Sequence, residues 1–439
     1  MRVYKPSGIK WLGEIPKHWE IRRLKYLFYI SKEESRDEFP NVLSLTQNGI
    51  IERDITTNKG QLAQNYIGYN IVKRGDIILN PMDLSSGYAA KSTFEGVISQ
   101  AYIKIRPLKT LNLSYYESFF QNLYHYKILW HLGKGISYDH RWTLGNDVFL
   151  NIKIPLPPLQ EQKEIAEFLD KKCEKIQNYI NKKQKLITLL QEKKQALINK
   201  VVTKGLNPNI EFKNSEIEYL GLIPHHWEVV KVKYIATTNI GLVYDPSEIA
   251  TNENVGYPVL RANNIQNGKI DYKDVIYVAK KIDDKQLAIS GDLLMCVRNG
   301  SENLLGKTAK IENNNFSFGA FTAIIRSDLN NYLYWIFQTE MLKKSISSFI
   351  VSIGIGQISQ DDIKNFKIPL PPLQEQKEIA EFLDKKCEKI NSAIEKTKKQ
   401  IELVKEYKNT LINEAVCGRI ACSRDFSPFS KAQNDKKKN

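Results

Sequence analysis

The side chains best suited to reading nucleic-acid bases lie in irregular stretches of this sequence. Arginine can form two hydrogen bonds with the edge of guanine, and asparagine or glutamine with the edge of adenine, in the major groove of DNA. The basic and amide residues of these stretches are Gln47, Asn48, Arg53, Lys91, His140, Arg141, Arg261, Asn263, Asn264, Arg298, Asn299, Lys307 and Gln357. Any one of them alone also fits a solvated loop, so only their gathering on one surface would indicate a binding site.

Motifs for catalysis or cofactor binding are incomplete. Ser301–Thr308 is similar to a phosphate-binding loop, but Gly300 stands one position too early for that motif. Asn80–Asp83 starts like the Asn-Pro-Pro-aromatic loop of amino-methyltransferases, yet the second proline and the aromatic residue are missing. His125 and His131 are spaced for neither a metal pair nor a catalytic dyad. We therefore predict no catalytic residue, no metal site and no cofactor bound by this chain itself.

The charge balance favours a polyanionic partner. Lys and Arg number 64 and Asp and Glu number 49 among 439 residues, a formal net charge of +15. Such a surplus suits nucleic acid. The charge is uneven, because residues 206–366 carry 16 basic and 18 acidic side chains. If that segment binds DNA, its positive residues must gather on one face, or other parts of the assembly must supply phosphate contacts.

Cysteine usage and hydropathy indicate a cytoplasmic protein. The five cysteines form an odd count without a C-x-x-C pair, which favours free thiols in a reducing compartment. No window approaches the roughly 18 continuous apolar residues of a membrane span, and the first residues do not read as a secretory leader. We expect neither secretion nor membrane insertion.

An internal repeat organises the chain. The segment Lys153–Ile176 returns letter for letter at Lys367–Ile390. A looser match pairs Ile9–Leu27 with Ile217–Ile235 through shared Leu-Gly, Ile-Pro, His-Trp-Glu and Lys-Tyr steps. The chain is therefore a tandem of two similar halves, each with a divergent segment followed by a repeated one.

The divergent segments read as strand-rich α+β domains. Gly75–Leu79 and Gly291–Met295 share a pattern, as do Ala101–Pro107 and Ala320–Ser327, and all four read as short strands. Long polar loops are expected over Leu45–Gln64 and Asn299–Asn315. Loops on a rigid scaffold are where recognition usually resides.

The repeated segments read as two long helices. Leu-Pro-Pro-Leu followed by Gln-Glu-Gln begins each one, because proline is tolerated in the first turn and acidic residues suit the positive end of the helix dipole. Apolar residues then recur with alternating spacings of three and four. We expect the helices to pair through Leu169, Ile176, Ile180, Ile187, Leu190 and Leu197 of the first and Leu383, Ile390, Ile394, Ile401, Val404 and Leu411 of the second.

Two arrangements of these helices remain open. A coiled coil of about 45 residues per helix would be a spacer of roughly 67 Å. The second divergent segment must fit between the end of the first helix and the start of the second, which favours an antiparallel pair with pseudo-twofold symmetry. Alternatively, each helix lies only on its own globular domain. The expected fold class is α+β, with two strand-rich domains and two long antiparallel helices.

The repeat also sets the expected domain boundaries. These are a first recognition domain over 1–153, a first helical spacer over 154–205, a second recognition domain over 206–367, a second spacer over 368–420 and a basic, disordered tail over 421–439.

This layout resembles the specificity subunits of type I restriction-modification systems, HsdS-like proteins with two variable target-recognition domains and two conserved helical regions. The resemblance rests on Ile154–Ile176 and its copy Ile368–Ile390, on Leu12–Glu20 and Leu220–Glu228, and on the helix ends at Val202–Gly205 and Val416–Gly418. It covers nearly the whole chain. Cys417 stands where the resemblance would place threonine, a small departure at a helix end.

The resemblance implies a non-catalytic subunit that binds a bipartite, asymmetric site in double-stranded DNA. It also implies two modification subunits that methylate adenine with S-adenosylmethionine, and restriction subunits that use ATP and magnesium to translocate and cut DNA. Two other classes stay open: a scaffold that joins two protein-binding domains, and a nuclease. Steep loss of DNA binding with salt, together with sequence preference, would separate a DNA reader from a scaffold.

Overall fold

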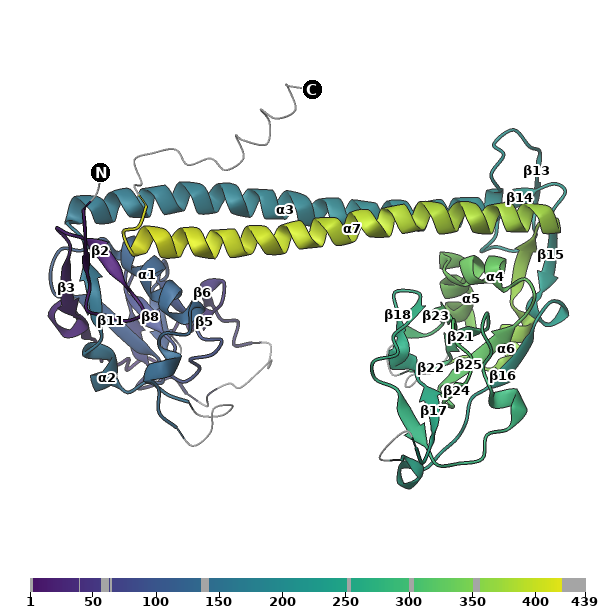
Figure 1. Cartoon of the computed structure of the whole chain (residues 1–439), viewed down its shortest axis with the longest axis horizontal. Coiled ribbons are helices and arrows are strands. Elements are labelled where there is room, and N and C mark those ends of the chain that lie inside the picture. Colours follow the sequence, from purple (N-terminus) through teal and green to yellow (C-terminus); the bar gives the residue numbers. More distant parts are fainter. Residues whose placement is uncertain are drawn as a thin grey trace. The chain divides into compact units, whose positions relative to one another are not determined.

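A computed structural model describes residues 3–38, 40–56, 63, 65–135, 142–250, 254–299, 304–349 and 356–420 (Figure 1). The chain forms two compact units. Unit 1 contains Met1–Lys183 and Lys399–Asn439, and unit 2 contains Gln184–Lys398. Each unit therefore combines one divergent segment with parts of both long helices.

Unit 1 is built on short antiparallel strands. Its central sheet has the order β4-β11-β8-β9, and β12 pairs with β3 where the chain leaves the globular part for the long helix. Two helices accompany these strands, α1 (Leu113–His125) and α2 (Asn146–Leu150). The strands are β1 (Tyr4–Pro6), β2 (Glu14–Pro16), β3 (Glu20–Arg23), β4 (Phe28–Ile30), β5 (Leu43–Thr46), β6 (Gly49–Glu52), β7 (Asn70–Val72), β8 (Ile77–Leu79), β9 (Ala89–Lys91), β10 (Gly96–Ile98), β11 (Ile103–Pro107) and β12 (Lys153–Leu156).

Unit 2 has the larger sheet, in the order β16-β25-β21-β23-β19-β18, and a three-stranded sheet β20-β17-β24. Its shorter helices are α4 (Asn330–Phe337), α5 (Glu340–Phe349) and α6 (Gln360–Asn365). The strands are β13 (Phe212–Asn214), β14 (Leu222–Pro224), β15 (Glu228–Lys231), β16 (Thr237–Ile240), β17 (Tyr257–Leu260), β18 (Ile265–Gln266), β19 (Lys269–Ile270), β20 (Ile276–Val278), β21 (Leu293–Cys296), β22 (Arg298–Asn299), β23 (Thr308–Lys310), β24 (Ser317–Phe318), β25 (Thr322–Arg326), β26 (Gly356–Gln357) and β27 (Lys367–Leu370).

The strand predictions from the shared patterns are confirmed, whereas the loop predictions were partly wrong. The four patterned segments contain β8, β21, β11 and β25. The expected loop over Leu45–Gln64 instead begins with part of the β5–β6 hairpin, and Asn299–Asn315 contains β23. These strands are short and carry polar residues, so strand pairing rather than local propensity decides them: β5 pairs with the adjacent β6, and β23 pairs with β21.

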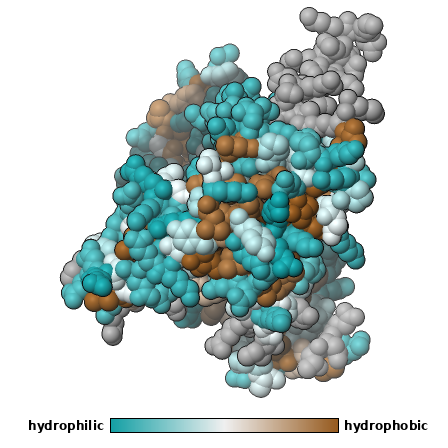
Figure 2. Space-filling view, turned by 90° about the vertical axis from the view of Figure 1, so that its left-hand side faces the viewer, coloured by the Kyte–Doolittle hydropathy of each residue, from teal (hydrophilic) through white to brown (hydrophobic). Residues whose placement is uncertain are grey.

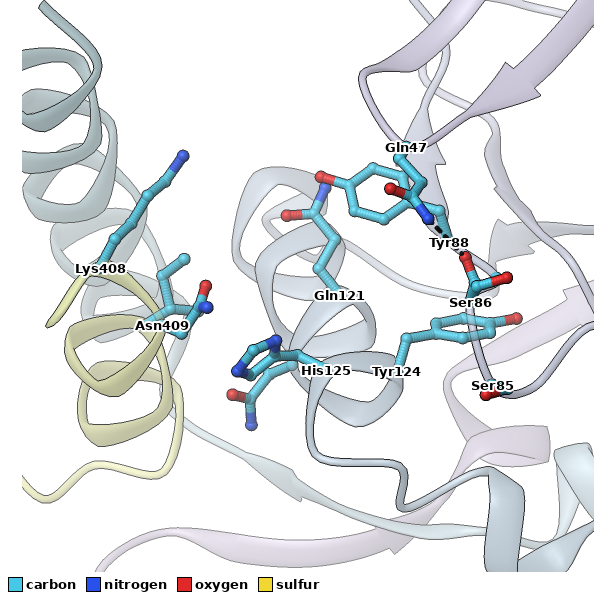
Figure 3. A pocket seen from close by; sticks show the side chains of 12 residues that line it. Gln47, Ser85, Ser86, Tyr88, Gln121, Tyr124, His125, Lys408 and Asn409 are labelled. Atoms are coloured by element: carbon cyan, nitrogen blue, oxygen red, sulfur yellow. Dashed lines mark hydrogen bonds between the residues drawn. The ribbon is translucent and has the colours of Figure 1, made fainter. Parts of the chain in front are cut away.

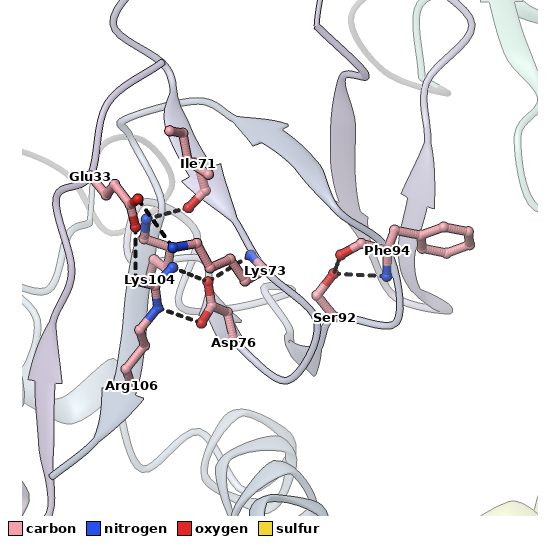
Figure 4. A network of polar contacts seen from close by, with 8 residues as sticks. All are labelled: Glu33, Ile71, Lys73, Asp76, Ser92, Phe94, Lys104 and Arg106. Carbon is pink, nitrogen blue, oxygen red and sulfur yellow. Dashed lines mark hydrogen bonds and ion pairs between the residues drawn. The ribbon is translucent and has the colours of Figure 1, made fainter.

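In each unit a buried aspartate bonded to a half-buried arginine holds the central strands, and Figure 4 shows the pair of unit 1. In unit 1, Arg106 Nε donates to Asp76 Oδ1 at 2.7 Å and Nη2 donates to Oδ2 at 2.9 Å. In unit 2, Arg326 makes the same two bonds to Asp292, at 2.9 and 2.7 Å. The hydrogen bonds to aspartate raise the pKa of each arginine above its ordinary value. These pairs explain why Gly-Asp and a distant Arg occur in both divergent segments.

The two long helices are α3 (Leu159–Lys204) and α7 (Leu373–Val416), as the repeat predicted. In unit 1, Lys408 of α7 lies close enough to Cys173 of α3 to oppose the rise that burial causes in the thiol pKa. In unit 2, Lys194 Nζ of α3 donates to Asn391 Oδ1 of α7 at 3.0 Å. Positions therefore rise along one helix as they fall along the other, and the pair is antiparallel.

The predicted pairing residues differ in burial along the helices. Leu169, Ile176, Ile180, Leu383, Ile394, Ile401 and Leu411 are buried, and Ile187, Leu190, Leu197, Ile390 and Val404 are half-buried. Parts of both helices also join the core of unit 2, where Ile198 and Val202 of α3 cluster with Ile379 and Leu383 of α7. The two arrangements considered from the sequence are thus combined, because the helices pair with each other and also pack on globular structure.

One buried tryptophan in each unit joins the beginning of one helix to the end of the other. In unit 1, Trp19 Nε1 donates to Glu161 in the first turn of α3 at 3.1 Å. Gly418, just after α7, lies so close to that indole that an added Cβ would be 2.7 Å from Trp19 Cη2. Its φ of +74° is also one that favours glycine. Trp19 therefore ties both helices to the globular part of unit 1.

Candidate nucleic-acid interface

One set of candidate base-reading residues of unit 2 lies beyond the end of β21. The Asp292–Arg326 pair braces one end of β21 and β25, and the chain continues from the other end of β21 into β22. There, Arg298 stands opposite Gln357 in the β22–β26 pair, and Asn299 stands opposite Gly356. The fold thus brings together candidates that lie far apart in the sequence.

Lys307 and Phe321 extend this group. The amide of Cys296 donates to the Lys307 carbonyl at 2.8 Å, which places Lys307 beside the end of β21. The Arg298 guanidinium carbon lies 5.3 Å from the centre of the Phe321 ring, a cation–π contact. The sequence analysis did not select Phe321, because it stands in a segment that reads as a strand. The sequence signal that could have identified Phe321 is an aromatic residue directly after Gly-Ala, at the start of the predicted strand.

A second set of candidates in unit 2 surrounds Asp274. Arg261 Nη2 contacts Asp274 Oδ2 at 3.4 Å, and Asn263 Nδ2 donates to the same oxygen at 3.1 Å. Asn264 is buried, and its side-chain amide donates to the backbone carbonyls of Asp271 and Asp274. Arg261 and Asn263 can face a ligand, whereas the Asn264 side chain holds the turn on which they stand.

The two sets meet at one loop. A side chain built on Gly319 would lie 3.6 Å from Tyr244 and 3.9 Å from Arg261, and Phe321 with its Arg298 contact follows two residues later. Positive and aromatic side chains are therefore gathered within a segment whose net charge is negative.

In unit 1, Gln47 and Asn48 occupy the tip of the β5–β6 hairpin. Gln47 Nε2 donates to the Ser86 carbonyl at 3.1 Å, so the hairpin is tied to a neighbouring loop. The amide of Arg53, just after β6, donates to the Val42 carbonyl at 2.8 Å. Gln47, Asn48 and Arg53 therefore lie on or next to a single hairpin.

Lys91 is placed differently from the other candidates of unit 1. Its ammonium donates to Ser114 Oγ at 2.6 Å, and its amide donates to the Glu117 carboxylate at 2.9 Å. Burial raises the pKa of Glu117, and the bond from Lys91 opposes that shift. Lys91 thus joins β9 to α1 rather than reaching outward. His140 and Arg141 lie outside the described residues.

A pocket of about 320 Å³ lies behind the Gln47 hairpin (Figure 3). The side chains of α1 face those of α7 across it, with Tyr88 and the Ser85–Ser86 turn on a further side. His125 lines the pocket, and burial lowers the pKa of its imidazole, which favours the neutral form. The lining combines polar and apolar surface, and of the candidate base-reading residues only Gln47 contributes to it.

A second hollow in unit 1 has an apolar character. Figure 2 shows brown side chains gathered among polar ones on the face that it displays. The groove that Ile9, Trp11, Leu132 and Val148 help to line has a volume of about 730 Å³, and Lys10, Arg23 and Lys153 add positive charge to its lining.

The near-motifs for catalysis have structural roles where the structure describes them. Asn80 Oδ1 accepts hydrogen bonds from the amides of Met82 and Asp83, at 3.0 and 3.3 Å, which closes a turn. Among the described residues, no group of three or more His, Cys, Asp or Glu side chains could hold a metal ion. Cys173, Cys296, Cys387 and Cys417 are free thiols. No helix in the described part of the chain is long and apolar enough to cross a membrane.

Comparisons with known proteins agree on one family. Residues 16–191 and 224–403 match the Type I restriction modification DNA specificity domain. The chain is 28% identical to the type I restriction enzyme MjaVIII specificity subunit of Methanocaldococcus jannaschii, over 96% of this chain and 97% of that protein. It is 29% identical to the EcoKI specificity subunit of Escherichia coli strain K12, over 47% of this chain and 46% of that protein.

Solved structures show the same fold. A chain from a structure of type I R-M system complex assembly covers 92% of this chain and 99% of its own length, with a TM-score of 0.71 and 17% identity. The HsdS subunit of Thermoanaerobacter tengcongensis also covers 92% of this chain and 98% of its own length, with a TM-score of 0.51 and 17% identity. The α+β architecture with two long helices is thus shared across low sequence identity.

Proposed function

The chain belongs to the family of type I restriction-modification DNA specificity subunits, and we propose on that basis that each of its two divergent domains reads one half of a bipartite, asymmetric DNA site. In this proposal the recognition domains are 1–153 and 206–367 and the helical spacers are 154–205 and 368–420, the boundaries predicted from the repeat. The spacers set the distance between the two half-sites. The tail over 421–439 has no assigned part.

One observation carries this proposal: the same tryptophan–glutamate junction between a helix and a globular domain occurs in both units, whereas the loops of the two units differ. Trp19 bonds Glu161 in unit 1, and Trp227 bonds Glu375 in unit 2, both at the start of an identical helical sequence. The candidate residues lie on different loops in the two units. Unit 1 has the Gln47 hairpin, and unit 2 has the contact between Arg298 and Phe321. Two identical helical segments can bind two copies of the same partner, whereas two different sets of loops can bind two different DNA half-sites.

The candidate contacts divide between the two domains. Gln47, Asn48 and Arg53 serve the first domain, together with His140 and Arg141, which are candidates from the sequence alone. Arg261, Asn263, Arg298, Asn299, Lys307 and Gln357 serve the second. Asn264, which is buried, and Lys91, whose ammonium and amide both bond to α1, support these surfaces rather than reading bases.

The partners of the proposed complex supply its chemistry. Two adenine methyltransferase subunits dock on the helical spacers and bind S-adenosylmethionine, and restriction subunits use ATP and magnesium. This chain contributes recognition and no catalytic group. The proposal places the complex in the cytoplasm of a prokaryotic host.

Modification-sensitive sequencing of host DNA, with and without this gene, tests the proposal. We expect a two-part motif with a fixed gap whose methylated adenines disappear when the gene is deleted. If the partner subunits are expressed and no such motif is lost, the chain is a scaffold. A complex that contains a single modification subunit, or two halves that recognise the same bases, would also contradict the proposal.

A further inference from the structure

Phe321 is a large apolar side chain that a well-anchored loop holds toward solvent. The residue is 57% exposed. Its carbonyl accepts hydrogen bonds from the amides of Val297 at 2.9 Å and Arg298 at 3.3 Å, and the amide of Ala320 donates to Leu242 at 2.9 Å. The loop is therefore bonded to two other segments of unit 2. These backbone bonds hold the ring in an exposed position. The free energy that burial of its apolar surface would provide is therefore lost unless a ligand covers the ring.

The neighbours of the ring indicate which ligand that is. The Arg298 guanidinium lies over the ring at 5.3 Å, and Gln357 stands opposite Arg298 in the strand pair. Arginine suits guanine, glutamine suits adenine, and a phenylalanine ring suits the C5-methyl group of thymine, all in the major groove. A positive group and an amide around a protruding apolar ring thus match the edges of consecutive base pairs.

The register of the central strands shows that unit 1 lacks this ring. Ile325 pairs with Leu293, directly after Asp292, and Ile105 pairs with Ile77, directly after Asp76. Four positions before Ile325 the chain has Phe321, and four positions before Ile105 it has Ala101. Phe321 and Ala101 both precede the paired residues of β25 and β11, so this strand pairing does not require an aromatic side chain there. Tyr102, the aromatic residue next to Ala101, packs against the core of unit 1 instead.

We propose that Phe321 is a specificity-determining residue that contacts a thymine methyl group in the half-site read by the second domain, next to a base pair read by Arg298. The inference rests on the proposed function and assigns one contact within it. Because unit 1 has Ala101 at the corresponding register position and its neighbour Tyr102 packs on the core, thymine recognition of this kind is confined to one half of the site.

The test replaces single thymines by uracil, which removes only the methyl group. The full chain in complex with its modification subunits is titrated with duplexes of its methylated motif, each carrying one replacement. We expect one replacement in the second half-site to weaken binding about fourfold, the effect of one buried methyl-sized group. Phe321→Ala should weaken binding of the thymine duplex by a similar factor and abolish the difference between thymine and uracil.

Tyr234 provides a matched control in the same unit. It is 73% exposed and has the Lys233 ammonium 5.2 Å from its ring centre, as Phe321 has Arg298. It stands in the short helix that follows β15, far along the chain from the Gly319 loop. Tyr234→Ala should therefore bind every duplex as the wild type does.

Several results would overturn the inference. One is unchanged discrimination between thymine and uracil in Phe321→Ala, and another is a second half-site without thymine. Loss of a modification subunit from the Phe321→Ala complex would assign the ring to a protein interface instead. A wild-type complex without sequence preference would overturn the proposed function as well, whereas retained preference with unchanged thymine discrimination overturns this inference alone.

Discussion

The indole nitrogen of Trp227 donates a hydrogen bond of 3.0 Å to the carboxylate of Glu375, which lies 148 positions further along the chain. Trp227 is fully buried, and His226 contacts the same carboxylate oxygen at 2.9 Å. Gly205, at the end of α3, packs on the same indole, with an added Cβ 3.3 Å from Trp227 Cζ2. The tryptophan of the repeated His-Trp-Glu motif therefore joins the end of α3 and the start of α7 to the globular part of unit 2.

Replacing this indole by a ring without a donor should weaken unit 2. Trp227→Phe leaves one bond to the Glu375 carboxylate unmade, and hydrogen bonds to charged groups contribute about 1.5–3 kcal/mol. We expect the calorimetric transition that includes unit 2 to move to lower temperature. Glu378→Gln, one turn further along at an exposed position of α7, is the control and should leave the transition in place. Equal melting temperatures for Trp227→Phe and wild type would show that the joint contributes no stability.

A side chain at Gly418 should disrupt the corresponding joint of unit 1. Gly418 has φ of +74°, and an added Cβ would be 2.7 Å from both Trp19 Cη2 and Pro16 Cδ. The left-handed conformation alone costs about 1–2 kcal/mol for a residue with a Cβ, and the close contacts add to this. Gly418→Ala should therefore lower the free energy of unfolding, measured by denaturant titration. Gly145→Ala is the control, because Gly145 has φ of −70° and no atom within 4 Å of an added Cβ.

Stability should fall steeply above pH 10. Burial raises the pKa of Tyr88 in unit 1 and of Tyr334 in unit 2 to about 12, from an ordinary value of 10.0. Between these values the unfolded chain loses the phenolic proton while the folded chain keeps it. Each group therefore contributes stability that is complete below pH 10 and is lost as the pH rises toward 12, by about 1.4 kcal/mol per pH unit.

The alkaline transition can be followed by tyrosinate absorbance and circular dichroism together. The absorbance of the buried tyrosines should rise with unfolding rather than before it. Tyr334→Phe should move the midpoint of the transition to higher pH, although it also removes a hydrogen bond of 3.2 Å to the Gly268 carbonyl. Tyr26→Phe, at an exposed tyrosine, should not move it. Ionisation of Tyr334 at pH 10 in the folded protein would contradict the assignment.

Exchange of the first domain should alter one half of the methylated motif. Replacing residues 10–150 by the equivalent segment of a relative is expected to change one half-site and to leave the other half and the gap unchanged. A change in helix length within 160–203 should instead alter the gap, because α3 carries that segment as part of the spacer. Sequencing of methylated DNA from cells with each variant measures both. Simultaneous change of both halves after the domain exchange would refute modular recognition.

The amino-acid sequence by itself determined the helices, their repeat and the central strands. Proline tolerance, dipole preference and apolar spacing are local properties, so Leu159–Lys204 and Leu373–Val416 could be recognised without a structure. The Gly-Asp and Arg patterns likewise marked β8, β11, β21 and β25, although their salt bridges were not foreseen.

Only the tertiary structure decided which polar side chains face outward and which neighbours they have. Asn263 and Asn264 are neighbours of the same residue type, yet Asn263 is exposed whereas Asn264 is buried with its amide bonded to backbone carbonyls. The ammonium of Lys91 likewise bonds Ser114 of α1. The sequence pattern predicts a strand over Phe321. In the structure β25 begins at the next residue, and Arg298 lies over the Phe321 ring. Residue type limits which hydrogen bonds a side chain can form, whereas the choice among partners depends on how distant segments pack.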